Sequence, residues 1–448
     1  MMQASAGLPV PGASRLRVLR VYHGGRNAAH RARERSLQAA HVDVTLVVPA
    51  SWPEHGGETT LSGESFPIVE LAVSRAGDVN RHGYTDPGKV RRLIRELTPD
   101  ILDPHEEPFS LAARQWMAAA PPELPVVMYT AQNVDKRYPP PFGIYERRAH
   151  RRVAALYPCS RQAASVARGK GFAGLIDVIP LGYDPALFYE GTQSLDDDEL
   201  VLALFGRLVP EKGVRDAVHV LARVNGMRPA RLIVSGSGPE EKPARELAAS
   251  LRVDDRVEIQ PWRPTGELAE VYRRAHVVLV PSIATATWVE QFGRVIVEAH
   301  ASGAVVAGYA SGAIPEVAGA AGVLADVGDA NGLADRVVAL FDDPVTYGGL
   351  RDLGLALSRT RTWSHVAERQ VELYRRVCDG ELEYQALPHS PRKRRALARA
   401  EFGATAATTA GTRPFALPLL RRGRAAAVAL AALVDATSES YARLTTRR

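Results

Sequence analysis

A glycine-rich basic segment, residues 206–213 (GRLVPEKG), contains side chains whose types and spacing could bind an anion. It follows an apolar stretch that predicts a strand, and it precedes a stretch with helical spacing. A glycine-rich turn at such a place would aim backbone N–H groups and a helix start at an anion. Arg207 and Lys212 add two positive charges, which would suit a diphosphate whose negative charge grows as it leaves. The same segment would also suit an ordinary strand-to-helix turn with solvated basic side chains.

A second segment, residues 290–298 (EQFGRVIVE), places two carboxylates, Glu290 and Glu298, eight positions apart. If a helix begins near Phe292, its rise separates them by about 10 Å or more, which is too far for one proton-transfer pair. They are better placed to accept hydrogen bonds from hydroxyls at two ends of one ligand. Backbone N–H groups at the helix start would point at the same ligand: those of Phe292, Gly293, Arg294 and Val295. The alternative is a helix with a favourable N-terminal acid and one solvated glutamate.

The first half of the chain contains weaker candidates for a ligand site. His105 could hydrogen-bond a hydroxyl, and the neighbouring Glu106 and Glu107 could meet hydroxyls or cations. Gly24 and Gly25 follow the first predicted strand and would let the backbone approach a ligand closely. A packed histidine beside solvated acids, and an ordinary glycine turn, are the alternative interpretations.

The elements that must position these residues are short β-branched runs alternating with helical patterns, which predict parallel sheets of βαβ units. We expect strands at 16–22, 42–49, 68–73, 126–130, 178–181, 200–205, 231–235, 257–260, 277–281 and 304–307, and a helical stretch at 27–40. The polar segment 191–199 predicts a linker between two doubly wound domains, with a cleft at the carboxyl ends of both sheets. The expected organisation is an N-terminal domain at 15–190, a C-terminal domain at 198–362, a helix at 363–379 that packs back on the body, and a basic tail at 380–448.

Composition places the chain among ordinary globular proteins. Its 448 residues allow two or three domains, and 46% of them are hydrophobic and 24% charged. Two isolated cysteines, Cys159 and Cys378, favour neither a disulfide framework nor a zinc site and indicate a reducing compartment. Residues 1–14 lack the pattern of a signal peptide, and the apolar run 425–434 is about half the ~20 residues that span a bilayer. We therefore expect a cytoplasmic protein, peripheral at the inner membrane face if it meets a membrane.

The positive charge is concentrated in the tail. From Pro391 to Arg448 there are twelve Lys or Arg residues and three acids, so this tail has a net charge of +9. The whole chain has a net charge of +6, so the residues before the tail have a net charge of −3. We expect disorder over 381–420 and a possible helix at 422–444. The run 392–395 (RKRR) would suit an anionic membrane surface, although a solvated extension is the alternative. The acidic run 196–198 (DDD) is expected to be solvated linker without a metal.

In order and spacing, the segments 206–213 and 290–298 resemble those of the family 4 glycosyltransferases. The resemblance covers roughly residues 16–377 and includes 180–184 (PLGYD), 235–239 (SGSGP) and 312–317 (GAIPEV). It implies an α/β GT-B fold, in which two Rossmann-like doubly wound domains face a cleft. It also implies a nucleotide-diphosphate sugar donor and transfer with retention of configuration.

The resemblance also implies a role for each matching residue. Arg207 and Lys212 would bind the donor diphosphate. Glu290 would contact the sugar hydroxyls, Glu298 would hold the ribose, and the segment around Gly236 would lie near the nucleoside. The main-chain groups of four residues would contact the sugar and phosphates: Phe292, Gly293, Arg294 and Val295. His105 would face the donor sugar, the Gly24–Gly25 loop would lie near the diphosphate and acceptor, and Gln132 and Asn133 would bind the acceptor.

The implied reaction moves a hexose-type sugar to an acceptor hydroxyl on a glycan, a lipid-linked sugar or a small molecule. His105, Glu290, Arg207 and Lys212 are the expected catalytic residues. We expect no cofactor besides the donor, no metal and no specific nucleic-acid partner. Two alternatives remain: another GT-B enzyme such as an epimerase or phosphorylase, and a non-catalytic protein that binds sugar nucleotides or nucleic acid.

Overall fold

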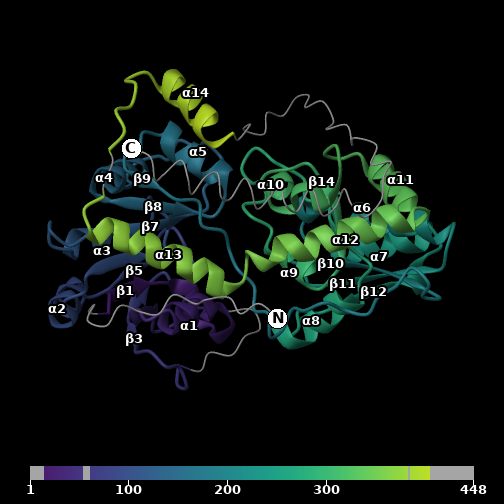
Figure 1. Cartoon of the computed structure of the whole chain (residues 1–448), viewed down its shortest axis with the longest axis horizontal. Coiled ribbons are helices and arrows are strands. Elements are labelled where there is room, and N and C mark those ends of the chain that lie inside the picture. Colours follow the sequence, from purple (N-terminus) through teal and green to yellow (C-terminus); the bar gives the residue numbers. More distant parts are fainter. Residues whose placement is uncertain (1–14, 54–60, 382–383, 404–448) are drawn as a thin grey trace, which may run out of the picture.

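The chain forms two α/β domains that lie side by side, coloured purple to blue and teal to green in Figure 1. The computed structural model describes residues 15–53, 61–381 and 384–403. Both sheets are parallel and both begin with the order 3-2-1-4, the doubly wound arrangement that the sequence predicts. The prediction of a GT-B type of fold is confirmed.

The N-terminal domain contains a four-stranded sheet in the order β3-β2-β1-β6 and a three-stranded sheet in the order β7-β8-β9. A parallel bridge between Leu102 and Val126 continues one into the other. The strands are β1 (Arg17–Val21), β2 (Asp43–Pro49), β3 (Ile68–Leu71), β6 (Ile101–Pro104), β7 (Val127–Thr130), β8 (Ala155–Pro158), β9 (Leu175–Ile176) and the small hairpin β4 (Val73–Ser74) and β5 (Gly83–Tyr84). The helices are η1 (His23–Arg26), η2 (Ala28–His30), α1 (Ala32–Ala39), α2 (Pro87–Leu97), α3 (Leu111–Ala119), α4 (Phe142–Arg152) and α5 (Arg161–Gly169).

The C-terminal domain is built on one parallel sheet in the order β12-β11-β10-β13-β14-β15. Its strands are β10 (Leu200–Phe205), β11 (Ala230–Ser235), β12 (Val257–Gln260), β13 (Val277–Val280), β14 (Val305–Tyr309) and β15 (Gly322–Ala325). Its helices are η3 (Pro210–Lys212), α6 (Val214–Asn225), α7 (Glu241–Ser250), η4 (Asp254–Arg256), α8 (Thr265–Arg274), α9 (Arg294–Ala301), α10 (Ile314–Ala318), η5 (Gly319–Ala321), α11 (Ala330–Phe341) and α12 (Pro344–Arg359). Every residue of β10 is buried, because helices cover both faces of the sheet. The strand order reverses between β10 and β13, and such a switch point is where ligands bind.

The predicted strand at 178–181 is wrong, whereas the other predicted strands are present within about two residues. Ile179 still donates its backbone N–H to the carbonyl of Pro158, so the chain starts to continue the ladder of β8. Pro180 follows, and because it has no N–H the ladder stops there. The predicted helix at 27–40 is also shorter than expected, because two 3-10 turns precede α1. Five strands lie outside the predicted ranges: β5, β6, β8, β9 and β15.

The helix α13 (Trp363–Cys378) carries the chain back from the C-terminal to the N-terminal domain, where it packs on α1 (Figure 1). Its apolar face, including Val366 and Val371, is buried in the core that holds Val18 of β1. At the crossing, Tyr183 and Thr362 form a parallel bridge, with hydrogen bonds of 3.0 Å on either side of it. The chain therefore passes between the two domains twice, once through Tyr183 into the linker 191–199 and once through Thr362 into α13.

The expectation of disorder over 381–420 is wrong for residues 391–402, which form the helix α14 (Pro391–Phe402). This helix packs on α5, and Ala398 is fully buried there. Arg168 is 3.0 Å from Glu401, and Arg395 is 2.6 Å from Asp135, so part of the basic run is bound within the protein. The arginine- and alanine-rich composition predicted disorder because it does not reveal these partners, which lie in a distant part of the chain. The predicted helix at 422–444 lies outside the described residues.

Within the described residues, no helix is both long and apolar enough to cross a membrane.

Candidate functional site

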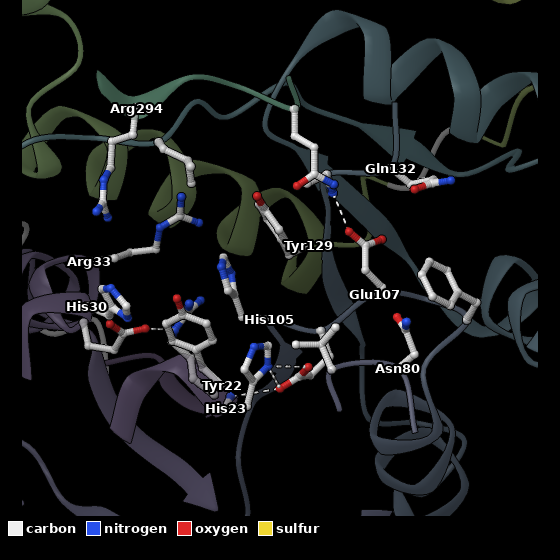
Figure 2. Close-up of a pocket in the computed structure, with 18 of the residues that line it drawn as sticks. Tyr22, His23, His30, Arg33, Asn80, His105, Glu107, Tyr129, Gln132 and Arg294 are labelled. Atoms are coloured by element: carbon white, nitrogen blue, oxygen red, sulfur yellow. Dashed lines mark hydrogen bonds and ion pairs between the residues drawn. The ribbon is translucent and has the colours of Figure 1, made fainter. Parts of the chain in front are cut away.

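A cavity of about 440 Å³ lies where the two domains meet (Figure 2). Its walls come mostly from the ends of β1, β6 and β7 in the N-terminal domain. The C-terminal domain contributes Gln291 and Arg294, and α13 contributes Trp363. In Figure 2, Arg33 and Arg294 lie on one side, Glu107 and Gln132 on the other, and His105 between them. The cavity is therefore rich in groups that could bind hydroxyls and anions.

His105 follows β6 and is held by a tyrosine and an aspartate. Its Nδ1 lies 3.2 Å from the hydroxyl of Tyr157, which donates its own proton to Asp103 Oδ1 at 2.6 Å. Because the tyrosine proton is used, the histidine Nδ1 must be the donor, and Nε2 is left as the hydrogen-bond acceptor. Burial, with the nearby charges of Arg33 and Arg20, holds the pKa of His105 well below its usual value. At neutral pH the imidazole is uncharged and can accept a hydrogen bond from a hydroxyl.

Glu107 lines the cavity, where its carboxyl group is largely removed from water. Its carboxylate accepts hydrogen bonds of 2.8 Å from the hydroxyl of Thr130 and from the backbone N–H of Ala131. Burial nevertheless raises the pKa of Glu107 from 4.5 to about 7, since removing a carboxylate from water disfavours its charged form. The group therefore titrates near neutral pH.

We expect Glu107→Gln to change how stability depends on pH. A carboxyl with a raised pKa binds more protons in the folded than in the unfolded state between pH 4.5 and about 7, so wild-type stability falls as pH rises through this window. The melting temperature of the variant, relative to wild type, should increase over the same window and level off above it. Glu96→Gln on the exposed face of α2 is the control and should show no such trend. A pH-independent difference for Glu107→Gln would contradict the assignment.

The backbones of the glycine-rich loops of the C-terminal domain are in close contact at the switch point. Gly213 has φ +67°, and a Cβ there would overlap the carbonyl oxygen of Pro281. A Cβ at Gly236 would overlap the carbonyl oxygen of Gly206, so the loops after β10 and β11 touch through their backbones. These glycines are therefore required by close backbone approach. The segment 206–213 contains the short η3, and α6 begins only after it.

Lys212 and Glu290 form an ion pair, with Nζ 2.6 Å from Oε2. Ser282 donates a hydrogen bond of 3.2 Å to the same oxygen, and Nζ lies 5.1 Å from the Trp288 ring centroid. Arg207 is exposed, and within the described part of the chain no hydrogen bond or ion pair holds its side chain. The predicted diphosphate and sugar residues are thus neighbours, and the lysine is paired while the arginine is available.

Glu298 lies in the second turn of α9, as the sequence predicts, although the helix begins at Arg294 rather than near Phe292. Arg294 Nε is 3.0 Å from Glu298 Oε1, and the hydroxyl of Tyr272 donates to Oε2 at 2.8 Å. Gly293 precedes the helix with φ +79°, a conformation that favours glycine. The tyrosine fixes the carboxylate in position, and the arginine reaches from the same helix to the cavity.

Asn133 does not line the cavity, where it was expected to bind an acceptor. It is buried, and its side-chain amide donates a 2.8 Å hydrogen bond to the backbone carbonyl of Glu290. Other contacts across the same boundary join the backbone N–H of Arg161 to Glu316 at 2.8 Å and Cys159 to the carbonyl of Gln291. Asn133 therefore ties the N-terminal domain to the segment that carries Glu290. Gln132, by contrast, does line the cavity.

The predicted residues fall into two neighbouring groups. His105, Glu106, Glu107, Gln132 and Arg294 line the cavity. Gly24 and Gly25 lie in the η1 turn, between the lining residues Tyr22, His23 and His30. The remaining predicted residues belong to the C-terminal domain: Arg207, Lys212, Gly236, Glu290, Phe292, Gly293, Val295 and Glu298. Sequence analysis missed several lining residues, among them His30 and Arg33. Their spacing of three positions in a predicted helix was the signal that they share a face.

The acidic linker run 196–198 lies beside a histidine of the C-terminal domain. Asp197 Oδ2 lies 3.2 Å from His276 Nε2, and Gln193 donates a 3.1 Å hydrogen bond to the carbonyl of Ser302. The linker is therefore held against the C-terminal domain by its polar side chains.

Two sequence families match the chain in consecutive stretches. Residues 34–187 match the family described as Glycosyltransferase Family 4, and residues 189–352 match that described as Glycosyl transferases group 1. A D-inositol 3-phosphate glycosyltransferase of Corynebacterium efficiens is 32% identical over 234 residues, which are 47% of this chain and 54% of that protein. One of Nocardia farcinica is 35% identical over 219 residues, 44% of this chain and 47% of that protein. The chain thus spans about half the length of the curated relatives it matches.

Solved structures share the fold at low sequence identity. Sucrose-phosphate synthase from Thermosynechococcus elongatus superposes with a TM-score of 0.62 at 18% identity, covering 82% of this chain and 100% of that one. Anabaena Alr3699/HepE, solved in complex with UDP-glucose, gives 0.63 at 17% identity, covering 80% and 99%. With matches that together run from residue 34 to residue 352, the chain belongs to the family 4 glycosyltransferases.

Proposed function

We propose that the protein transfers a sugar from a nucleoside diphosphate sugar to an acceptor hydroxyl, with retention of configuration. The observation that carries this proposal is the Lys212–Glu290 pair at the switch point of one domain, beside a cavity walled by the other. A cation next to a hydroxyl-binding carboxylate suits a ligand with a diphosphate and a sugar. Family membership supports the same reaction class.

The donor that we propose is a uridine diphosphate sugar. The nucleotide sugar bound in the Anabaena protein of similar fold supports this choice. Glu298, fixed by the hydroxyl of Tyr272, has an oxygen available to accept from a ribose hydroxyl once Arg294 moves aside. Arg207 and Lys212 would then neutralise the diphosphate.

The reaction follows from these charges. The bond between the anomeric carbon and the diphosphate oxygen breaks, and the positive charges of Lys212 and Arg207 stabilise the leaving group. The acceptor hydroxyl forms the new bond on the same face, and its proton passes to the departing phosphate oxygen. His105, uncharged and acting as an acceptor, would hold a sugar hydroxyl near the reacting carbon. Positioning and charge stabilisation carry catalysis.

For the acceptor we propose a small polyhydroxylated molecule. The cavity volume of about 440 Å³ falls in the range of small-molecule sites. Its walls offer hydroxyl-binding groups such as Glu107 and Gln132, and cations such as Arg33 and Lys136. Relatives named for an inositol phosphate support an acceptor of this size.

A panel of UDP-, GDP- and dTDP-sugars tests the donor. One of them should raise the melting temperature, because a ligand that binds only the folded state stabilises it. The same sugar should be hydrolysed slowly without acceptor, and the released sugar should keep its anomeric configuration by NMR. Stabilisation without any turnover would indicate a non-catalytic binder, and no stabilisation by any donor would contradict the proposal.

Tyr157→Phe is expected to slow the reaction without changing donor affinity. It removes the hydroxyl that fixes the Nδ1–H tautomer of His105, a hydrogen bond worth about 1 kcal/mol net, so kcat should fall about fivefold to tenfold. Donor affinity, measured calorimetrically, should stay constant. In a His105→Ala background the same substitution should have no further effect on kcat. Additive losses would show that Tyr157 acts through the fold instead.

The basic tail predicts binding to anionic membranes. Since α14 packs on the N-terminal domain, the relevant comparison is between the full chain and one that ends at Gly403. The removed part has seven arginines against two acids, and each basic residue near an anionic surface is worth about 1 kcal/mol. We expect the full chain to co-sediment with phosphatidylserine vesicles and the shortened chain to stay in solution. Equal sedimentation would remove the tail from this role.

A further inference from the structure

Two histidines and a glutamate from three separate segments meet at the floor of the cavity. His23 follows β1, His82 precedes β5 and Glu106 follows β6. One ligand atom from each lies within 4.8 Å of the other two, and this is the one such group of three among the described residues. His82 and Glu106 are buried, and His23 is 21% exposed. Trp52 packs on both imidazoles, at ring distances of 4.8 and 4.9 Å.

The hydrogen bond at Nδ1 of His82 fixes the protonation of its other ring nitrogen, Nε2. Nδ1 lies 3.1 Å from the backbone carbonyl of Asp78, and because a carbonyl only accepts, Nδ1 must carry the proton. In the neutral ring Nε2 is then a bare lone pair. This atom is buried without a hydrogen-bond partner, 3.9 Å from Glu106 Oε1. The lone pair of His82 Nε2 and the carboxylate oxygen of Glu106 thus face each other. Because both are electron-pair donors, a positive charge between them would stabilise the arrangement.

A proton or a metal ion could supply that charge. A proton on Nε2 would make His82 an imidazolium, whose charge would be shut away from water because the ring is fully buried. A metal ion suits the arrangement better. Ligating histidines commonly donate their other ring N–H to a backbone carbonyl, as His82 does to Asp78.

The remaining ligand atoms have spacings close to those of a tetrahedral site. Bonds of about 2.0–2.1 Å place ligand atoms about 3.3 Å apart. His23 Nδ1 is 2.8 Å from Glu106 Oε2, and His82 Nε2 is 3.9 Å from Oε1, so the two spacings fall on either side of that value. The backbone N–H of His23 also donates to Glu106 at 2.9 Å, which fixes the carboxylate. To bind an ion, His23 Nδ1 must release its proton, to solvent or to Nε2.

We propose that His23, His82 and Glu106 bind a divalent transition-metal ion, Zn²⁺ by preference for two imidazoles and one carboxylate. His23 and Glu106 line the cavity, so the fourth position opens into it, where an acceptor hydroxyl or water would complete the coordination. The site differs from the expectation of no metal in this protein. It lies on the acceptor side, apart from the charges of Lys212 and Arg207 that face the leaving diphosphate. Its existence does not depend on the proposed transfer reaction.

Metal titration of the chelator-stripped full chain tests the site. Calorimetry with Zn²⁺ should give one ion per chain, and Co²⁺ should give the visible absorption of a low-symmetry nitrogen and oxygen site. The ion should also raise the melting temperature. His82→Gln and Glu106→Gln should weaken Zn²⁺ binding by at least about 100-fold, more than the loss of an outer-sphere partner. His23→Asn changes a partly exposed side chain and serves if the buried variants do not fold.

The control is His300→Gln. His300 is as buried as His82 and both of its ring nitrogens lack hydrogen-bond partners, yet it belongs to no group of three ligands among the described residues. Its substitution should leave Zn²⁺ affinity unchanged. Lack of saturable binding by the wild-type chain, or equal affinity of wild type and a folded His82→Gln or His23→Asn variant, would overturn the proposal.

Donor binding separates this site from the transfer reaction. A nucleotide sugar should stabilise the metal-stripped protein, because its diphosphate is bound by Lys212 and Arg207. Donor stabilisation without metal binding would overturn the metal site alone. Metal binding without donor stabilisation would support the metal site and contradict the proposed donor.

Discussion

Lys212→Ala should lower kcat for sugar transfer by about 100-fold to 1000-fold, the loss typical when one charge-stabilising group is removed from a developing anion. The lysine Nζ lies 2.6 Å from Glu290 at the end of the sheet where a diphosphate would leave. Without it the leaving group must depart with one uncompensated charge. Steady-state kinetics with a saturating donor measures the effect. Arg207→Ala should act in the same direction with an unchanged melting temperature, since this side chain is exposed.

Lys170→Ala is the matched control for the lysine. Lys170 forms an ion pair of the same length, 2.6 Å to Glu146, with similarly limited exposure, but it lies in the N-terminal domain away from Glu290. Its loss should cost stability comparable to that of Lys212→Ala while leaving kcat near wild type. Near-normal kcat for both Lys212→Ala and Arg207→Ala, or an equal loss in Lys170→Ala, would remove the diphosphate assignment.

Asp103→Ala should reduce the free energy of unfolding by about 3–5 kcal/mol, the range for breaking a buried charge network by removing one partner. Asp103 is fully buried and pairs with Arg20, which is equally buried. It also accepts hydrogen bonds from Tyr157 at 2.6 Å, from Gln370 at 2.9 Å and from the hydroxyl of Tyr374. The substitution would leave a buried guanidinium with only Glu34 as its counter-ion.

Urea denaturation followed by circular dichroism measures this loss. The matched control is Asp43→Ala, which removes an exposed pair with Arg15 at 3.3 Å and should cost at most about 1 kcal/mol. Because Gln370 and Tyr374 belong to α13, the Asp103 variant should also expose α13 to proteolysis earlier than wild type. A loss below 1 kcal/mol, no larger than in the control, would mean that the network contributes little net stability.

The sequence predicted the C-terminal domain well because the features that define it depend on residues that are close together in the chain. The strand at 200–205 is a continuous apolar run, the glycines of 206–213 mark a turn, and Glu298 falls in the second turn of α9 as expected. Each of these features depends on neighbours within about ten positions. The side-chain pairing did not follow from spacing, since Lys212 and Glu290 are 78 positions apart.

The cavity could not be predicted as a unit, because its walls come from distant parts of the chain. Arg294 and Trp363 reach it from α9 and α13, and His82, which no motif marks, lies beneath it. Asn133 shows the same limit, since its partner Glu290 is 157 positions away. Helix α14 was missed because the aspartate that binds Arg395 is 260 positions earlier. Such pairs depend on how the two domains dock, which periodicity does not encode.

The crossing between Tyr183 and Thr362 has a mechanical consequence. Because the two covalent connections meet at that bridge, we expect the domains to rotate about it more easily than they slide past each other. A rotation that separates the domains at Asn133 would break its hydrogen bond to the carbonyl of Glu290. We therefore expect a sugar bound by the Glu290 side chain to restrain this rotation, and its release to make the rotation easier.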